Sequence, residues 1–333
     1  MVFHGVAYTE NKAEETFEER IPDTLIERDD QFFTFTFEND LFTGSDKYYT
    51  NGARLSHYDT GARMPNKIKN TLNKVPGIDI TETSSVYYSI GQNLYTPQDL
   101  TVSAAQPNDR PYAGFLYGAI GASTLEDNHV DNVELALGVV GPSALGKETQ
   151  KTVHRWSGAQ DPKGWDNQLK DEPAIMLSAE RVWPEAHTEE FKGLLLRVSP
   201  HVGATLGNVY TYGAAGATFQ LTPKKYQWQT PPIRVRPAIP GSGYFAVPEG
   251  AFAWSLFAGI EGRAIARNIF LDGNTFKDSH SVDKKPFVAD FNTGVSLTKG
   301  RARISYTINW RTKEFDNQSS NAMFGAVSVG YRF

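Results

Sequence analysis

Residues 31–40 have the sequence QFFTFTFEND, in which phenylalanine alternates with threonine and then glutamate from Phe33 to Glu38. A period of two is typical of a β-strand with one apolar and one polar face. The acidic segment ends at Asp40, and a second alternating segment spans residues 48–59. The sequence therefore predicts a β-hairpin whose mouth carries a carboxylate, an amide and a hydroxyl group. Such groups bind a hard cation or hold an oxyanion.

The same alternation recurs along nearly the whole chain. Near the C-terminus, for example, Ile304, Tyr306 and Ile308 alternate with Ser305 and Thr307. Twelve segments follow this pattern: residues 31–41, 48–59, 84–95, 111–124, 130–140, 173–184, 193–207, 209–221, 250–270, 284–298, 301–315 and 322–333. An even number of antiparallel strands can close a barrel with both chain ends on one side.

The composition favours one large all-β unit, because 333 residues include 20 Phe, 15 Tyr, 6 Trp and 29 Gly. The absence of cysteine excludes disulfides and thiolate metal sites. The net charge of -5 argues against nucleic-acid binding, which needs a basic surface. We therefore expect no nucleic-acid partner.

Alternation alone does not say which face is inside, so a soluble β-sandwich or barrel is one interpretation. No apolar run approaches the roughly 18 residues of a membrane helix. The last segment alternates up to Tyr331 and ends on Phe333. A terminal strand ending in an aromatic residue resembles the assembly signal of outer-membrane barrels. We therefore predict an all-β fold, a twelve-stranded antiparallel up-and-down transmembrane β-barrel.

The barrel is expected to occupy residues 31–333, after a polar N-terminal extension over residues 1–30. No hydrophobic run follows Met1, so we expect no signal peptide within the sequence as written. Residues 222–249 contain six prolines and predict a long loop on the same side as the chain ends.

Residues 145–156 break the alternation and predict a short helix in an extracellular loop. Gln150 and His154 lie four residues apart, on one face of this helix. By the strand count, the loop opens at the same end as Asn39, Asp40 and Thr50. The alternation places Asp40 and Thr50 on the lumenal face, so we expect the helix to bring His154 to them there. An imidazole beside a carboxylate and oxygen ligands could activate water for ester hydrolysis.

These motifs together resemble the lipid A 3'-O-deacylases of Gram-negative outer membranes. The resemblance covers residues 31–333 and rests on spaced motifs: Glu38-Asn39-Asp40, Tyr49-Thr50-Asn51-Gly52, Gln92, Asp109-Arg110-Pro111-Tyr112, Gln150, His154-Arg155 and Gly158-Ala159.

The resemblance implies a calcium-dependent hydrolase that removes the 3'-linked acyloxyacyl group of lipid A in the outer membrane. The family's catalytic histidine corresponds to His154, its Asn-Asp pair to Asn39 and Asp40, and its hydroxyl residue to Thr50. His154 would take a proton from water and Asp40 would help to hold Ca²⁺. Asn39 and Thr50 would orient or stabilise the oxyanion. The expected substrate is lipid A or lipopolysaccharide, and we expect a monomer.

One position departs from the family pattern. Family members carry a lysine in the loop after the third strand, whereas residues 96–103 contain none. The lipid A phosphates would instead meet Arg110, or Lys147, Lys151 and Arg155 on the helix. The alternative is that these basic residues form a solvated helix face.

Two other functions stay open at this stage. A serine esterase of the outer-membrane phospholipase type needs no G-x-S-x-G motif, so its absence excludes only an α/β-hydrolase. A passive porin or a structural barrel is the non-enzymatic alternative. Charged residues on the polar faces could line its channel, or they could pair with one another and plug it. These residues are Glu134, Arg197, Glu261, Arg263, Arg303 and Arg311.

Overall fold

The computed structural model describes residues 31–43, 48–59, 64–80, 84–126, 128–223, 243–245, 247 and 252–333. The N-terminal extension expected over residues 1–30 lies outside them. The strands are β1 (Gln31–Asn39), β2 (Tyr48–Asp59), β3 (Ser85–Thr96), β4 (Ala113–Leu125), β5 (Val130–Val140), β6 (Glu172–Val182), β7 (His187–Phe191), β8 (Leu194–Gly207), β9 (Tyr210–Pro223), β10 (Ala253–Asn268), β11 (Phe287–Lys299), β12 (Ala302–Arg311) and β13 (Ala322–Arg332). The helices are η2 (Asp40–Thr43), α2 (Asn66–Leu72), η3 (Pro142–Ala144), α3 (Gly146–Ser157), η4 (Trp165–Asn167) and α4 (Ile269–Asp272).

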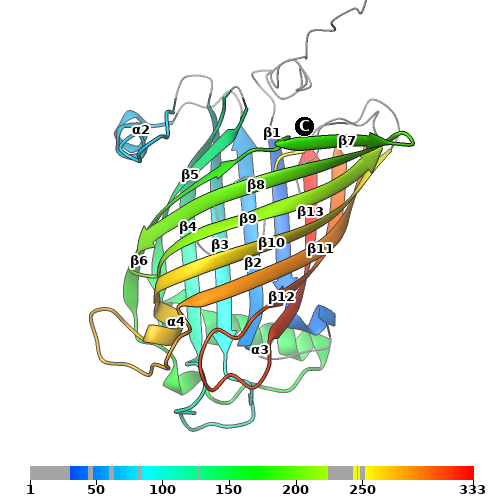
Figure 1. Ribbon diagram of the computed structural model, residues 1–333. Helices are drawn as coiled ribbons and strands as arrows, with labels where there is room; N and C mark the ends of the chain where they lie inside the picture. Colours follow the sequence, from blue (N-terminus) through cyan, green and yellow to red (C-terminus); the bar gives the residue numbers. More distant parts are fainter. Residues whose placement is uncertain are drawn as a thin grey trace, which may run out of the picture.

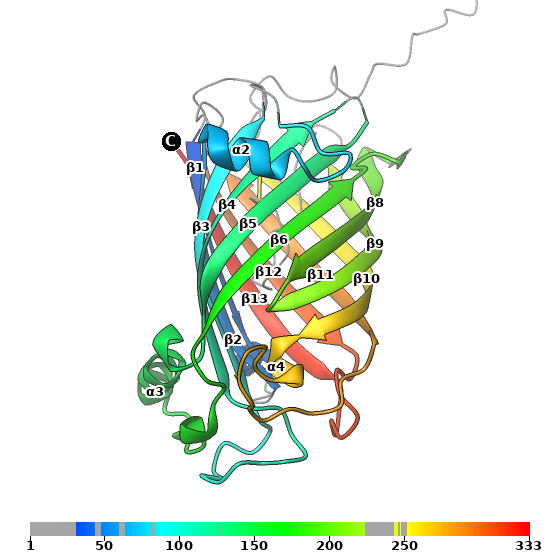
Figure 2. The same ribbon diagram turned by 90° about the vertical axis from the view of Figure 1, so that its left-hand side faces the viewer.

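These strands form one closed antiparallel sheet, drawn in Figure 1 and Figure 2. β1 pairs with both β2 and β13, and β6 pairs with β8, so the described sheet has no gap around the barrel. The short β7 continues the direction of β6 and pairs with the first residues of β8. The twelve predicted strands are therefore confirmed, with β7 as a short additional strand. The helices α2 and α4 were not predicted. No helix in the described ranges is long and apolar enough to cross a membrane.

The barrel wall is apolar outside and polar inside. Phe33 and Phe35 are 43% and 46% exposed, whereas Thr34 and Thr36 are 8% and 5% exposed. Apolar side chains on the outer face of a closed barrel suit the hydrocarbon of a bilayer. The alternation that predicted the strands therefore also separates the lipid-facing side from the lumen.

Most of the charged residues predicted for the lumen form ion pairs there, as one of the two expectations for them required. Arg54 pairs with Glu134, and Arg197 with Glu185 at 3.1 Å. Asp290 accepts from two guanidinium groups, those of Arg263 at 3.0 Å and Arg311 at 2.9 Å. The apolar outer face leaves the charged residues inside the lumen, and ion pairing compensates the burial of the paired charges there.

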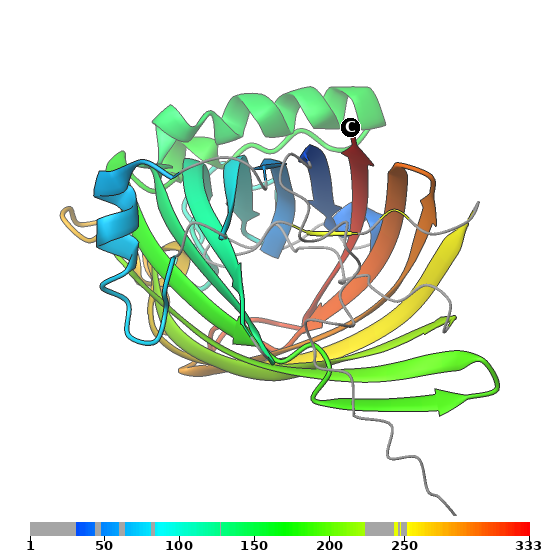
Figure 3. The ribbon, with the colours of Figure 1, turned by 90° about the horizontal axis from the view of Figure 1, so that it is seen from above.

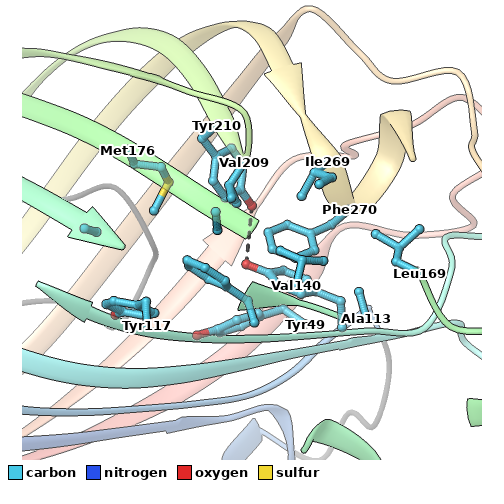
Figure 4. Close-up of a cluster of buried hydrophobic side chains, with 14 of the residues drawn as sticks. Tyr49, Ala113, Tyr117, Val140, Leu169, Met176, Val209, Tyr210, Ile269 and Phe270 are labelled. Atoms are coloured by element: carbon cyan, nitrogen blue, oxygen red, sulfur yellow. Dashed lines mark hydrogen bonds between the residues drawn. The ribbon is translucent and has the colours of Figure 1, made fainter. Parts of the chain in front are cut away.

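Aromatic side chains fill the lumen at the end where α4 lies (Figure 4). Phe270 of α4 stacks on Tyr95 with ring centroids 3.9 Å apart, and the Tyr95 and Tyr210 hydroxyls are 3.3 Å apart. At the opposite end, the β9–β10 loop enters the barrel: Arg303 donates to the Tyr244 carbonyl at 3.2 Å. The described part of this loop therefore lies on the same side as the chain ends, as the sequence predicted.

Candidate active site on the outer wall

A buried polar patch interrupts the apolar outer wall at the end that carries α3. By register, Asn39 pairs with Asn51, and Asn51 with Leu94. Paired residues of antiparallel strands project to the same face, and this row continues the outward face of Phe35. Phe35 is 46% exposed, but Asn39, Asn51 and Leu94 are 4%, 5% and 0% exposed. Some other segment must therefore cover the wall at this level.

The cover over β3 and β4 is α3, together with the turn η3 that precedes it. Figure 3 shows α3 outside the ring of strands. The Gln92 side chain on β3 donates to the Ala144 carbonyl of η3 at 2.6 Å. A Cβ atom at Gly114 of β4 would lie 3.2 Å from the Cα of Gly146. Glycines at these two positions therefore allow the helix backbone to approach the wall closely.

The neighbouring cover, over β13, is η2. Phe42 packs edge-to-face on outward-facing Phe37 with ring centroids 5.8 Å apart. A Cβ at Gly325 of β13 would lie 2.6 Å from the Phe42 Cβ. Since β1 and β2 lie between β13 and β3, η2 and α3 flank one stretch of outer wall. Asp40, the first residue of η2, is 1% exposed there.

The strand alternation from which Asp40 and Thr50 were expected to point into the lumen does not extend to either residue. Asp40 begins a 3-10 helix, so the strand alternation stops at Asn39. In β2 the register shifts between Tyr49 and Asn51, which leaves Thr50 as the extra residue of a β-bulge. A bulge changes the parity of side chains on its two sides, so alternation counted back from Arg54 does not apply at Thr50. The Thr50 side chain itself lies outside what the structure describes.

His154 sits on the face of α3 that is turned away from solvent and is 2% exposed. Its Nδ1 is 2.6 Å from the Gln160 carbonyl oxygen. A carbonyl can only accept, so Nδ1 carries the proton and Nε2 keeps its lone pair in the neutral ring. This hydrogen bond fixes the tautomer that a general base at Nε2 requires.

The sequence places Gln160 beside His154 through the end of α3. Gly158 has φ 72, and the Ala159 N–H donates to the His154 carbonyl at 3.0 Å. This is a Schellman-type helix end, which turns the chain back along the helix. The motif Gly158-Ala159 therefore positions the carbonyl that holds the imidazole.

Gln150 lies one turn before His154, is also 2% exposed, and was not assigned a role from the sequence. Its Oε1 accepts a hydrogen bond from the Trp165 indole N–H at 2.6 Å. That contact fixes the orientation of the amide, and within the described residues its Nε2 has no hydrogen-bond partner. The i, i+4 spacing to His154 was the available sequence signal for this residue.

The predicted phosphate contacts occupy different environments. Lys147 pairs with Asp166 at 2.7 Å, and this contact raises the Lys147 pKa and lowers the Asp166 pKa. Lys151 and Arg155 lie on the same helix, and Arg155 is exposed. Arg110 is 0% exposed and pairs with Glu314 at 3.3 Å. A phosphate contact was expected to be accessible, whereas this side chain is buried.

The donor types around the patch fit a hard cation. Asp40 supplies a buried carboxylate, while Asn39 and Asn51 supply amide oxygens. Within the described ranges, no group of three or more His, Asp or Glu residues could hold a metal ion. The oxygens of this patch that could hold a calcium ion are the Asp40 carboxylate and the side-chain amides of Asn39 and Asn51.

Comparisons with known proteins give a family match and several similar solved structures. A family model described as outer membrane protein LpxR matches residues 3–333. Among solved structures, LpxR from Salmonella typhimurium superposes with a TM-score of 0.72 at 21% sequence identity, covering 90% of this chain and 99% of that chain. The β domain of the Bordetella autotransporter Brka gives a TM-score of 0.45 at 8% identity, covering 92% and 99%. No curated protein matches the chain.

The family match spans almost the whole chain, and the structural likeness shows the same barrel fold. The family is the one that the spaced motifs on β1, β2 and α3 resemble. A closed barrel with an apolar outer face places the protein in the Gram-negative outer membrane. The chain therefore belongs to the LpxR family of outer-membrane proteins, the lipid A deacylase family that its motifs resemble.

Proposed function

We propose that the protein hydrolyses the ester that links the 3' acyloxyacyl group to lipid A. The observation that carries this proposal is the buried polar patch on the outer wall, where Asn39 and Asn51 face the lipid side but are covered by other segments. Polar groups at a lipid-facing position are costly and are retained where they serve a function. A site on this face meets a lipid substrate from within the bilayer.

The exposed residues around the patch support a lipid substrate. On α3, Trp156 is 85% exposed, and on η2, Phe42 is 42% exposed. Tryptophan and phenylalanine at this level suit the interface between acyl chains and headgroups. An ester near the headgroup of lipid A would lie at the same depth.

The proposed chemistry is attack of water on the ester carbonyl. Nε2 of His154 takes a proton as the water oxygen bonds to the carbonyl carbon, and the carbonyl electrons move onto the oxygen. Collapse of the tetrahedral intermediate breaks the bond between the carbonyl carbon and the sugar oxygen, and protonated His154 gives the proton taken from water to that sugar oxygen. The products are a free fatty acid and a sugar hydroxyl.

The remaining residues take supporting roles. Asn39 and Thr50 orient the ester or stabilise the oxyanion, and Asp40 would help to hold Ca²⁺, which would polarise the ester carbonyl. Lys147, Lys151 and Arg155 meet the phosphates of lipid A from the helix. Lysine and arginine in line along one helix face, with Arg155 exposed, suit that contact, and the alternative is ordinary solvation of the same face.

The decisive experiment follows the mass of lipid A incubated with the refolded protein in detergent, with Ca²⁺ or with a chelator. We expect loss of one acyloxyacyl unit that requires Ca²⁺. His154→Ala should lower the rate by about 10² to 10⁴, the usual contribution of a general base. His187→Ala is the matched control, because His187 is exposed on β7 at the opposite end of the barrel.

Three outcomes would contradict the proposal. An unchanged mass spectrum of lipid A in the presence of Ca²⁺ would contradict the deacylase activity. Covalent labelling by a fluorophosphonate that blocks activity would replace water attack with a serine nucleophile. Ion conductance in planar bilayers without any deacylation would favour a passive pore.

A further inference from the structure

A polar pocket of about 540 Å³, distinct from the patch on the outer wall, lies between the β3–β4 loop and the segment that follows α3. Leu100 lines it together with three amides, two carboxylates and a hydroxyl: Gln98, Gln106, Gln160, Asp99, Asp109 and Thr101. Its volume lies within the range of small-ligand sites. Among the described residues that line it, none is lysine, arginine or histidine. The pocket therefore does not suit a phosphate.

Contacts from the segment after α3 and from two other loops hold the pocket in shape. The Lys163 N–H, after α3, donates to the Leu100 carbonyl at 2.9 Å. Ser319, in the β12–β13 loop, donates to the Gln98 Oε1 at 2.6 Å. The His280 ring, in the β10–β11 loop, is 2.8 Å from the Asp109 carbonyl oxygen. A ligand would therefore meet a preformed site and would not have to order the loop.

The carboxylates act as hydrogen-bond acceptors. Both Asp109 oxygens accept backbone N–H groups, from Gln98 at 2.8 Å and from Arg110 at 2.7 Å. The Thr101 hydroxyl and N–H donate to Asp99 Oδ1 at 2.7 Å and 2.9 Å, and these bonds lower the Asp99 pKa. Asp99 is thus ionised at neutral pH, and no described residue donates to its Oδ2. An ionised acceptor among primary amides matches the hydroxyl groups of a sugar.

The position of the pocket relates it to the site under α3. Gln160 lines the pocket with its side chain, while its carbonyl accepts the hydrogen bond from His154 Nδ1 at 2.6 Å. A glycolipid whose ester reached Nε2 of His154 would therefore carry its sugars past this pocket. We propose that the pocket binds a neutral sugar of the saccharide attached to lipid A, and so favours glycosylated substrate. This inference rests on the proposed deacylase function.

The test compares two substrates, lipid A alone and rough lipopolysaccharide with a hexose-containing core, in calcium-containing detergent. We expect the protein to show a lower KM for the glycosylated substrate. Asp99→Asn should reduce this preference about tenfold, as loss of a charged acceptor predicts. Gln160→Ala, which keeps the main-chain carbonyl at His154, should reduce it in the same direction. Asp161→Asn is the control, because it removes the same charge next to the pocket without lining it.

A separate measurement keeps the two proposals distinguishable. Saturation-transfer NMR with the lipid-free, dephosphorylated core oligosaccharide reports sugar binding without turnover. Binding that weakens in Asp99→Asn but not in Asp161→Asn supports the pocket, even if no lipid is hydrolysed and the deacylase proposal fails. Normal deacylation with no preference for the glycosylated substrate, or a preference that Asp99→Asn leaves intact, overturns the pocket and leaves the deacylase proposal standing.

Discussion

At the scale of single residues, the tautomer of His154 depends on where α3 ends. The Gln160 carbonyl holds Nδ1, and the left-handed conformation of Gly158 brings that carbonyl back to the ring. A non-glycine residue with positive φ is strained by about 1 kcal/mol. One backbone conformation therefore contributes to the orientation of the proposed base.

Gly158→Ala tests this arrangement. A Cβ at Gly158 would meet no atom within 4 Å, so the change acts through the backbone alone. We expect kcat to fall about tenfold, since relief of the strain displaces the Gln160 carbonyl. Gly300→Ala is the matched control, because Gly300 also has positive φ and open space but lies in the β11–β12 turn. Equal losses of deacylation rate in the two variants would refute the link to His154.

At the scale of elements, the decisive contact is between α3 and the outer wall. Gln150 and His154 are 2% exposed because α3 packs closely against the wall, where Gly114 of β4 meets Gly146 in the first turn of the helix. Apolar packing adds to this contact, because Leu94 lies in one buried cluster with Leu100, Tyr112 and Trp165. The segment after α3 therefore packs between the helix and the barrel wall through Trp165, which contacts both Gln150 and Leu94.

Gly114→Ala tests the packing of α3. The added Cβ would lie 3.2 Å from backbone atoms of Gly146, so the helix must shift. We expect a deacylation rate reduced about tenfold or more with the barrel intact, and faster proteolysis of the α3 loop. Gly118→Ala is the control, because Gly118 lies four residues further along β4 on the same outer face and its nearest atom would be 3.9 Å from the added Cβ, so the deacylation rate should not change. A rate in Gly114→Ala equal to that in Gly118→Ala would count against α3 as the positioning element.

At the scale of the whole molecule, ion pairs in the lumen join loops that are distant in sequence. Arg110 in the β3–β4 loop and Arg311 at the end of β12 both pair with Glu314, which is 2% exposed. Burial acts to raise the Glu314 pKa, but the charges of Arg311 and Arg110 outweigh it and hold this pKa below its ordinary value. The β3–β4 loop, which carries the polar pocket, is thereby tied to the opposite wall.

Glu314→Gln should destabilise the fold by about 3 kcal/mol at neutral pH, because it leaves buried guanidinium groups without a countercharge. A lowered folded-state pKa gives stability that is present above the unfolded value of 4.5 and is lost as pH falls through the folded value. The difference between wild type and variant in urea unfolding should therefore shrink below pH 4.5. Asp316→Asn, in an exposed pair with Lys285, should change stability by less than about 1 kcal/mol. A difference that stays constant down to pH 2 would contradict this role.

The sequence by itself determined the strands, the polar lumen and the helix face shared by Gln150 and His154, because each follows from local periodicity. Only the tertiary structure decided on which side of the wall the site lies. Alternation cannot be counted through the bulge at Thr50 or into the 3-10 helix at Asp40. A loop helix can pack against either face of a barrel. Here the missing side chains of Gly114 on the wall and Gly146 on the helix let α3 pack against the outer face. That choice depends on contacts between segments far apart in the chain, which local patterns do not contain.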